Sequence, residues 1–111
     1  MSDGFRERYL RLVVFFDLPV LTAAQRKRYS QFRKFLIKDG YLMIQKPVYS
    51  KLVINEAAAA GAVGRLRKNK PAEGLVQVLR VTEKQFATMV CIAGEQAERE
   101  EVSTTDELVV L

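Results

Sequence analysis

The alternation of hydrophobic and polar positions is most informative near the N-terminus, where apolar residues 12–16 run without a break and stop at Asp17. A short apolar run rich in Val and Phe is typical of a buried strand. Pro19 has no backbone N–H to donate to a sheet, so we expect the strand to span about 11–17. An acid at a strand end belongs either to a turn or to a site, and the pattern alone favours the turn.

The next segment repeats with the period of a helix. Tyr29, Phe32 and Leu36 fall on one face and predict a stripe that packs against a core. Thr22 is suited to cap the start of this helix, and Gly40 is suited to end it in a left-handed conformation. We therefore expect a helix between these two residues.

Residues 41–54 read as extended chain, with apolar positions on both sides of Pro47. Because proline cannot donate a ladder hydrogen bond, the segment predicts two strands, or one strand with a sharp bend. Asn55 then caps a second helix that reaches about Asn69.

Beyond the second helix, residues 75–81 alternate in the manner of a strand, and residues 83–86 resemble a turn or a short helical piece. Residues 88–93 are apolar and predict another strand. Residues 95–106 are acidic and weakly patterned. The apolar end at 108–111 predicts a short strand that pairs with a sheet edge of this chain or of a partner.

The order strand, helix, strand, strand, helix, strand predicts an α+β fold, a ferredoxin-like βαββαβ sandwich with an extra C-terminal strand. Both helices would cover one face of an antiparallel sheet. The other face would need cover from the tail or from a second copy, and we expect a homodimer. Residues 1–94 form the predicted domain, and residues 95–111 form an acidic tail with a short terminal strand.

Composition narrows the chemistry. The chain has 111 residues, 49% of them hydrophobic, which fits one domain with a modest core. It has no histidine, so the commonest general base and zinc ligand are absent, and a bound metal would take oxygen ligands. The single cysteine, Cys91, lies in an apolar run and predicts a core residue in a reducing cytoplasm. No apolar run is long enough for a membrane span.

Charge is unevenly distributed. Residues 1–70 hold 15 Lys/Arg against 5 Asp/Glu, whereas residues 71–111 hold 3 against 8. A basic body suggests a polyanion such as nucleic acid, and ordinary solvated helix faces are the alternative. Nine cations on the two predicted helices and just after the second are the candidate nucleic-acid contacts: Arg26, Lys27, Arg28, Arg33, Lys34, Arg65, Arg67, Lys68 and Lys70.

Five blocks together resemble the small CRISPR-associated protein of spacer acquisition, Cas family two, in its type II form. The resemblance covers about residues 10–93. Its blocks are VFFDLP at 14–19, QRKRY at 25–29, FRKFL at 32–36, GY at 40–41 and QKPVY at 45–49.

This resemblance implies a ferredoxin-like homodimer in which Asp17 meets its symmetry mate and binds Mg²⁺, with Mn²⁺ as an alternative. It also implies metal-dependent endonuclease activity on RNA or DNA. The dimer would join the CRISPR integrase and hold the middle of a new spacer duplex, with its C-terminal strand reaching the partner's sheet or the integrase. Phe16 and Pro47 depart from the family's usual Tyr and Ser, and both changes remove a hydroxyl.

Two functional hypotheses follow. In the first, paired Asp17 carboxylates bind a hard cation that activates a phosphodiester. In the second, which we prefer, the dimer is a scaffold for double-stranded DNA, and RNA is a further candidate ligand. The helical cations would then contact phosphates without reading sequence. A small-molecule regulatory domain of the same fold and a toxin-type ribonuclease are the alternatives.

Overall fold

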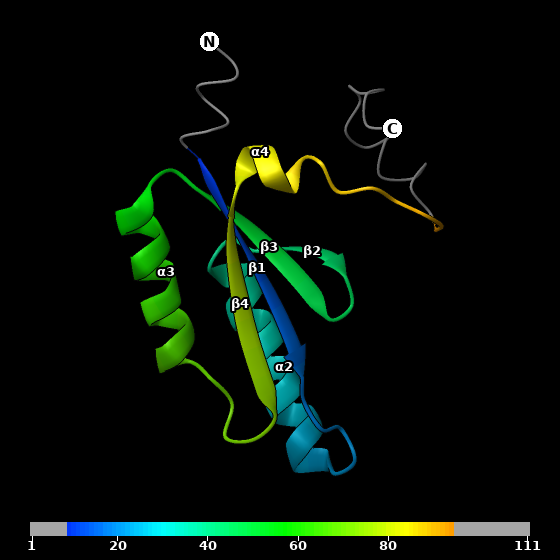
Figure 1. Ribbon diagram of the computed structural model, residues 1–111. Coiled ribbons are helices and arrows are strands. Elements are labelled where there is room, and N and C mark those ends of the chain that lie inside the picture. Colours follow the sequence, from blue (N-terminus) through cyan, green and yellow to red (C-terminus); the bar gives the residue numbers. More distant parts are fainter. Residues whose placement is uncertain (1–8, 95–111) are drawn as a thin grey trace.

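The computed structural model describes residues 9–94, which form four strands and three helices (Figure 1). The predicted order of the first six elements is confirmed, with bounds that differ by a residue or so. The elements are β1 (Leu10–Asp17), α2 (Ala23–Lys38), β2 (Leu42–Gln45), β3 (Val48–Val53), α3 (Glu56–Lys68), β4 (Leu75–Thr82) and α4 (Glu83–Phe86).

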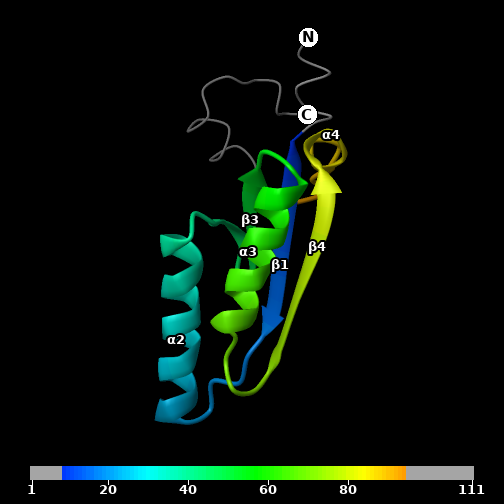
Figure 2. The ribbon, with the colours of Figure 1, turned by 90° about the vertical axis from the view of Figure 1, so that its left-hand side faces the viewer.

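The four strands form one antiparallel sheet in the order β2-β3-β1-β4. Leu10 pairs with Val53 on one side and with Thr82 on the other, so β1 is flanked along its length. Both α2 and α3 lie against the same face of this sheet, and the opposite face is bare of long helices (Figure 2). This mixed architecture is compatible with the predicted ferredoxin-like plan.

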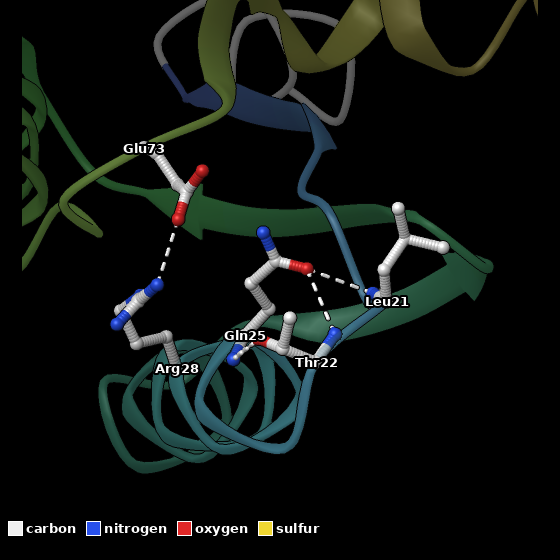
Figure 3. Close-up of polar contacts among 5 residues, drawn as sticks. All are labelled: Leu21, Thr22, Gln25, Arg28 and Glu73. Atoms are coloured by element: carbon white, nitrogen blue, oxygen red, sulfur yellow. Dashed lines mark hydrogen bonds and ion pairs between the residues drawn. The ribbon is translucent and has the colours of Figure 1, made fainter.

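The long helix α2 begins where the sequence predicts. The Thr22 hydroxyl accepts a hydrogen bond from the backbone N–H of Gln25 at 3.1 Å. The Gln25 side-chain oxygen in turn accepts from the backbone N–H groups of Leu21 and Thr22 at 2.8 and 3.0 Å (Figure 3). This reciprocal capping box satisfies N–H groups that the first helical turn leaves free. The helix ends before Gly40, whose φ of +98° suits a residue without a side chain.

Alternate residues of β1 build the core. Leu12 and Val14 are fully buried on the side that faces the helices, and Phe16 is 4% exposed. The Phe16 ring meets the ring of Phe32 from α2 edge-on, with centroids 5.2 Å apart. Leu66 from α3 closes the same cluster. The apolar residues that recur every second position in the strand and every 3.6 positions in the helices thus pack into one apolar layer.

The other residues of β1 face the uncovered side of the sheet. Paired strand residues point to the same face, so the row Leu42, Ser50, Val13 and Leu79 crosses all four strands on this side. Leu42 is 72% exposed and Leu79 is 51% exposed. We call this surface the open sheet face. Its exposed residues are Phe15, Leu42, Leu52, Leu75 and Leu79, whereas Val13 and Ser50 in the middle of the row are only 7% and 4% exposed.

The prediction of a strand at 88–93 is wrong. A second capping box, between Thr82 and Gln85, starts α4 as soon as β4 ends. The N–H of Met89 then bonds to the carbonyl of Phe86 at 3.1 Å, so the chain turns instead of continuing as a strand. Met89 lines a hollow with Val13 and Leu79 of the sheet. Both neighbours of β1 are already in place, which leaves no interior position for a further strand. The predicted acidic tail and terminal strand at 95–111 lie outside the described residues.

The prediction that Cys91 is a core residue is also wrong, because its side chain is exposed. Neighbouring Ile92 is 89% exposed. An apolar run becomes buried only where an element carries it to the core, and 89–94 form no regular element.

The short helix α4 is fixed to the sheet by Arg11. The guanidinium donates to both carboxylate oxygens of Glu83 at 2.7 Å and stacks 4.5 Å from the centre of the Phe86 ring. A bidentate, half-buried pair of this kind is stronger than an exposed ion pair. It sets the direction in which the chain leaves β4 at one end of the open sheet face.

Gly74, at the start of β4, provides a test of this arrangement. Its φ is +98°, and an added Cβ would lie 2.6 Å from a methyl carbon of Leu18 and 2.9 Å from the carbonyl oxygen of Asp17. We expect Gly74→Ala to lower the free energy of unfolding by about 1–3 kcal/mol, measured by urea denaturation. Gly64→Ala is the control, because a Cβ added at this position in the middle of α3 would have no contacting atom within 4 Å. This substitution should raise the free energy of unfolding by about 0.5–1 kcal/mol. Equal effects of the two substitutions would contradict this packing.

Candidate active site and nucleic-acid interface

Asp17 is the last residue of β1, and its side chain is exposed. It pairs with Leu75 of β4, so it stands on the same side of the sheet as Val13 and Phe15. The strand stops here because Leu18 turns into the core and Pro19 cannot continue the ladder. The carboxylate therefore lies at the border of the open sheet face, at the end of a rigid strand.

Of the five acids between residues 9 and 94, Asp17 is the one that forms no ion pair. The other four each hold an arginine with a nitrogen–oxygen distance of 2.7 or 2.8 Å. These pairs are Arg11–Glu83, Arg28–Glu73, Arg65–Asp39 and Arg80–Glu56. The same segment contains fifteen Lys/Arg residues. A carboxylate that stays unpaired among so many cations is available for a ligand.

A hollow of about 520 Å³ opens beside Asp17, between the end of β1, the start of α2 and the β2–β3 turn. The Nζ of Lys46 lies 5.6 Å from the centre of the Tyr29 ring, within reach of a cation–π interaction. The guanidinium of Arg26 donates to the carbonyls of Val20 and Leu21 at 3.2 and 3.0 Å, which fixes it against the loop. The lining residues are Phe16, Asp17, Leu18, Val20, Arg26, Tyr29, Lys46 and Pro47.

Some of the predicted cations on α2 form ion pairs or hydrogen bonds with other described residues, and others do not. We call the first group engaged cations and the second group free cations. Arg28 pairs with Glu73 and so ties α2 to the loop before β4 (Figure 3). The Nε of Arg33 donates to the hydroxyl of Tyr49 at 3.1 Å. Lys27 and Lys34 are exposed and form no ion pair or hydrogen bond with the described part of the chain. Their seven-residue spacing places them two turns apart on one helix face.

The cations of α3 divide in the same way. Arg65 donates to Asp39 at 2.8 Å and so joins the ends of the two helices. Arg67, Lys68 and Lys70 are exposed and have no such partner within residues 9–94. The two helices that carry Lys27, Lys34, Arg67 and Lys68 lie on one side of the sheet (Figure 2).

The ion pair of Asp39 and Arg65 covers a buried tyrosine. Tyr41 is 1% exposed, and burial, together with the nearby Asp39 carboxylate, raises the pKa of its phenol to about 12. Lys51 lies over the same ring and donates to the backbone carbonyl of Asp39. These contacts give Arg65 a structural role in joining the helices.

The candidate residues therefore form two sites. Asp17 stands at the border of the open sheet face, whereas α2 and α3 cover the opposite face. Arg26 is the predicted cation that lines the hollow with Asp17, and the other eight do not line it. Tyr29 and Lys46 were not among the predicted site residues. The sequence placed Tyr29 in the core stripe, and a lysine before a proline in a turn gave a weak signal for Lys46.

A metal ion would find few protein ligands in one copy. Within residues 9–94 no three His, Cys, Asp or Glu side chains gather in a group that could hold a metal ion. Asp17 by itself can supply one carboxylate, a ligand set that suits a cation which keeps most of its waters. The same described segment contains no helix long and apolar enough to cross a membrane.

Comparison with known proteins gives one consistent result. The family model of the CRISPR associated protein Cas2 matches residues 10–89. A Treponema denticola protein named CRISPR-associated endoribonuclease Cas2 is 55% identical over 102 residues, covering 92% of this chain and 100% of the relative. Proteins of the same name from Acidovorax ebreus and Streptococcus mutans are 51% and 46% identical, covering 77% and 78% of this chain and 83% and 80% of their own lengths.

Proposed function

This chain belongs to the CRISPR-associated protein Cas2 family, and from that premise we propose that it serves CRISPR spacer acquisition as a dimeric scaffold that binds nucleic acid within the integrase complex. We propose further that the dimer cleaves phosphodiesters in a metal-dependent reaction centred on Asp17, and that it works in the cytoplasm. The curated relatives are named endoribonucleases, which supports RNA as one substrate.

The open sheet face supports a dimer. Leu75 is 55% exposed and Leu52 is 42% exposed, in addition to Leu42 and Leu79, so large apolar side chains from three strands face water in one copy. Several large apolar side chains exposed on one face of a sheet mark an interaction site. A second copy is the occupant that a two-fold axis provides without any further partner, because the same surface serves both subunits.

The unpaired Asp17 carboxylate is the observation that carries the nuclease proposal. Since Asp17 borders the open sheet face, a dimer formed through that face would bring the Asp17 carboxylates of the two subunits closer together. Two nearby carboxylates repel each other unless a proton or a cation lies between them. Mg²⁺ suits this set, because it commonly binds one or two carboxylates together with waters and substrate phosphate, and Mn²⁺ has similar preferences. When bound, such an ion supplies charge neutralisation at a phosphate oxygen and acidifies a water.

The free cations support the scaffold proposal. Lys27 and Lys34 on α2, with Arg67, Lys68 and Lys70 at the end of α3, have their charges available for phosphates. Contacts of this kind are independent of sequence and weaken steeply with salt. The aromatic residues of α2 pack against the core, where Phe32 is 3% exposed, so the helix offers no series of stacking rings for a single strand. We therefore propose that duplexes bind more tightly than single strands.

Removal of a free cation should weaken duplex binding more than removal of an engaged one. We expect Lys34→Gln to reduce the affinity for a short DNA duplex by about 3–10-fold and to lower the slope of log affinity against log salt by roughly one. Fluorescence anisotropy over a salt series measures both quantities. Arg28→Gln is the control, because Arg28 already forms an ion pair with Glu73. This substitution should change the affinity by less than about twofold. Equal losses of affinity in the two variants would argue against this division of the cations.

Reconstitution tests the proposed function as a whole. The chain is mixed with its integrase partner and a short duplex, and insertion into a CRISPR repeat is measured for the wild type, for Lys34→Gln and for Asp17→Asn. The scaffold proposal predicts that insertion requires this chain, falls in Lys34→Gln and persists in Asp17→Asn. Insertion that proceeds equally well without the chain would refute it.

A further inference from the structure

We infer that the acidic segment 95–107 of this chain binds the free cations of the two long helices and competes with nucleic acid for them. Against one arginine, Arg99, this segment holds six acids: Glu95, Glu98, Glu100, Glu101, Asp106 and Glu107. The inference rests on the proposed function, because the segment and a duplex would use the same cations. It adds a regulation of duplex binding that is built into the chain itself.

The charges of the chain are divided between two parts. Residues 9–94 hold fifteen Lys/Arg against five Asp/Glu, a balance of +10, whereas residues 95–107 have a balance of −5. Four of the five acids in residues 9–94 are already paired with arginines at 2.7 or 2.8 Å, so they cannot neutralise further cations. The largest source of additional negative charge in the chain is therefore the segment 95–107.

The free cations are suited to receive an acidic chain. Lys27 and Lys34 are exposed on α2, and neither forms an ion pair or hydrogen bond within residues 9–94. Arg67 and Lys70 line a hollow of about 350 Å³ between α3 and β4, which is an edge strand of the sheet. Cations that line a concave surface concentrate their field there and attract an anion more strongly than scattered cations do.

The segment is attached directly to the end of the described chain and is long enough to reach these helices. Its thirteen residues can span at most roughly 43–47 Å, whereas the sixteen residues of α2 extend for about 24 Å. A short tether gives the attached segment an effective concentration on the order of millimolar. Ion pairs that are too weak to hold a separate peptide can therefore form within the chain.

A duplex can displace this segment because its charge density is higher. Double-stranded DNA carries one negative charge per roughly 1.7 Å of its axis, whereas the segment carries a net charge of −5 over thirteen residues. A duplex that contacts several free cations at once would release the acids to solvent. The full chain should therefore bind a duplex less tightly than its cations alone would allow.

Neutralisation of the segment in the full chain tests the competition. We expect the combined substitution Glu98→Gln, Glu100→Gln and Glu101→Gln to raise the affinity for a short DNA duplex by about fivefold or more at about 50 mM salt. The gain should fall below about twofold at about 300 mM salt, because salt screens exposed ion pairs. The combined substitution Ser103→Ala, Thr104→Ala and Thr105→Ala is the matched control, since it changes the same segment without changing its charge, and it should leave the affinity unchanged.

A second comparison separates binding of the segment from simple repulsion between the segment and the duplex. Repulsion would give the same gain from neutralisation whichever cations are present. Contact with the free cations predicts that the gain falls to less than about half in a chain that also carries Lys34→Gln and Arg67→Gln. The gain should be unchanged in a chain that carries Arg28→Gln, because Arg28 is paired with Glu73. Equal gains in these two backgrounds would overturn the inference.

Nuclear magnetic resonance without nucleic acid distinguishes this inference from the proposed function. Neutralisation of the segment in the isotope-labelled full chain should shift the signals of Lys34 and Arg67 and leave those of Arg28 in place. Such shifts in a chain that binds no duplex would uphold the inference and refute the scaffold proposal. Duplex binding that depends on Lys34, with no effect of neutralisation on the affinity or on these signals, would do the reverse.

Discussion

Asp17→Asn is expected to lower metal-dependent cleavage of RNA or DNA by at least about 100-fold, the usual loss when one group that stabilises transition-state charge is removed. Asparagine has the same shape but no charge, so in the proposed dimer it would bind Mg²⁺ only weakly. Because Asp17 forms no ion pair within residues 9–94, the substitution should leave the monomer as stable as before. It should also strengthen the dimer, since two facing carboxylates no longer repel.

Three measurements on the same preparation test this prediction. Cleavage rates with Mg²⁺ and with Mn²⁺ should fall, while duplex affinity stays within error of the wild type and the thermal midpoint does not fall, because a stronger dimer would raise it. Glu73→Gln is the matched control, because Glu73 is an acid of the same region that is already occupied by Arg28. Unchanged cleavage in Asp17→Asn, or an equal fall in Glu73→Gln, would place the activity elsewhere or identify it as contamination.

Leu79→Glu is expected to raise the dissociation constant of the dimer by at least about 100-fold. In one copy Leu79 is 51% exposed, so a glutamate is tolerated there. In a dimer formed through the open sheet face, the carboxylate would be buried without a partner, at a cost of about 3–5 kcal/mol. The effect should exceed that of any substitution on the helix side, because Leu79 lies on the face that the proposed interface would bury.

Ile37→Glu provides the matched control for that substitution. Ile37 is 49% exposed, nearly the same fraction as Leu79, but it lies on α2 on the opposite side of the sheet. Sedimentation equilibrium should find Ile37→Glu dimeric at concentrations where Leu79→Glu is monomeric, with both variants folded by circular dichroism. A wild type that is monomeric at micromolar concentration, or a Leu79→Glu variant that remains dimeric, would exclude this interface.

Much of the fold could be predicted because its signals are local. Thr22 and Gly40 bound α2 through their own side-chain and backbone chemistry, and Pro47 separates β2 from β3 for the same reason. The strand predicted at 88–93 is wrong because its apolar residues suit a strand, but the capping box between Thr82 and Gln85 turns the chain before this segment can pair with the sheet. A local signal for a helical start therefore outweighed strand propensity.

The candidate site was predictable only in part. Asp17 could be identified because it ends an apolar run, and the helical cations could be identified because there are so many of them. The ion-pair partners of these cations could not be predicted, because Glu73 is 45 residues from Arg28 and Asp39 is 26 residues from Arg65. Those distant pairs decide which cations remain free. The hollow could not be predicted either, since it joins residues from a strand end, a helix and a turn that meet only in the folded chain.

One measurement tests the central claim most directly, that two copies joined through the open sheet face hold a duplex with cations from both helices. Sedimentation velocity of the full chain with a short fluorescent DNA duplex gives the stoichiometry and the affinity together. The account predicts two chains per duplex and a fall in affinity of about 100-fold or more between about 50 and about 200 mM salt. One chain per duplex, or an affinity that does not change with salt, would contradict it.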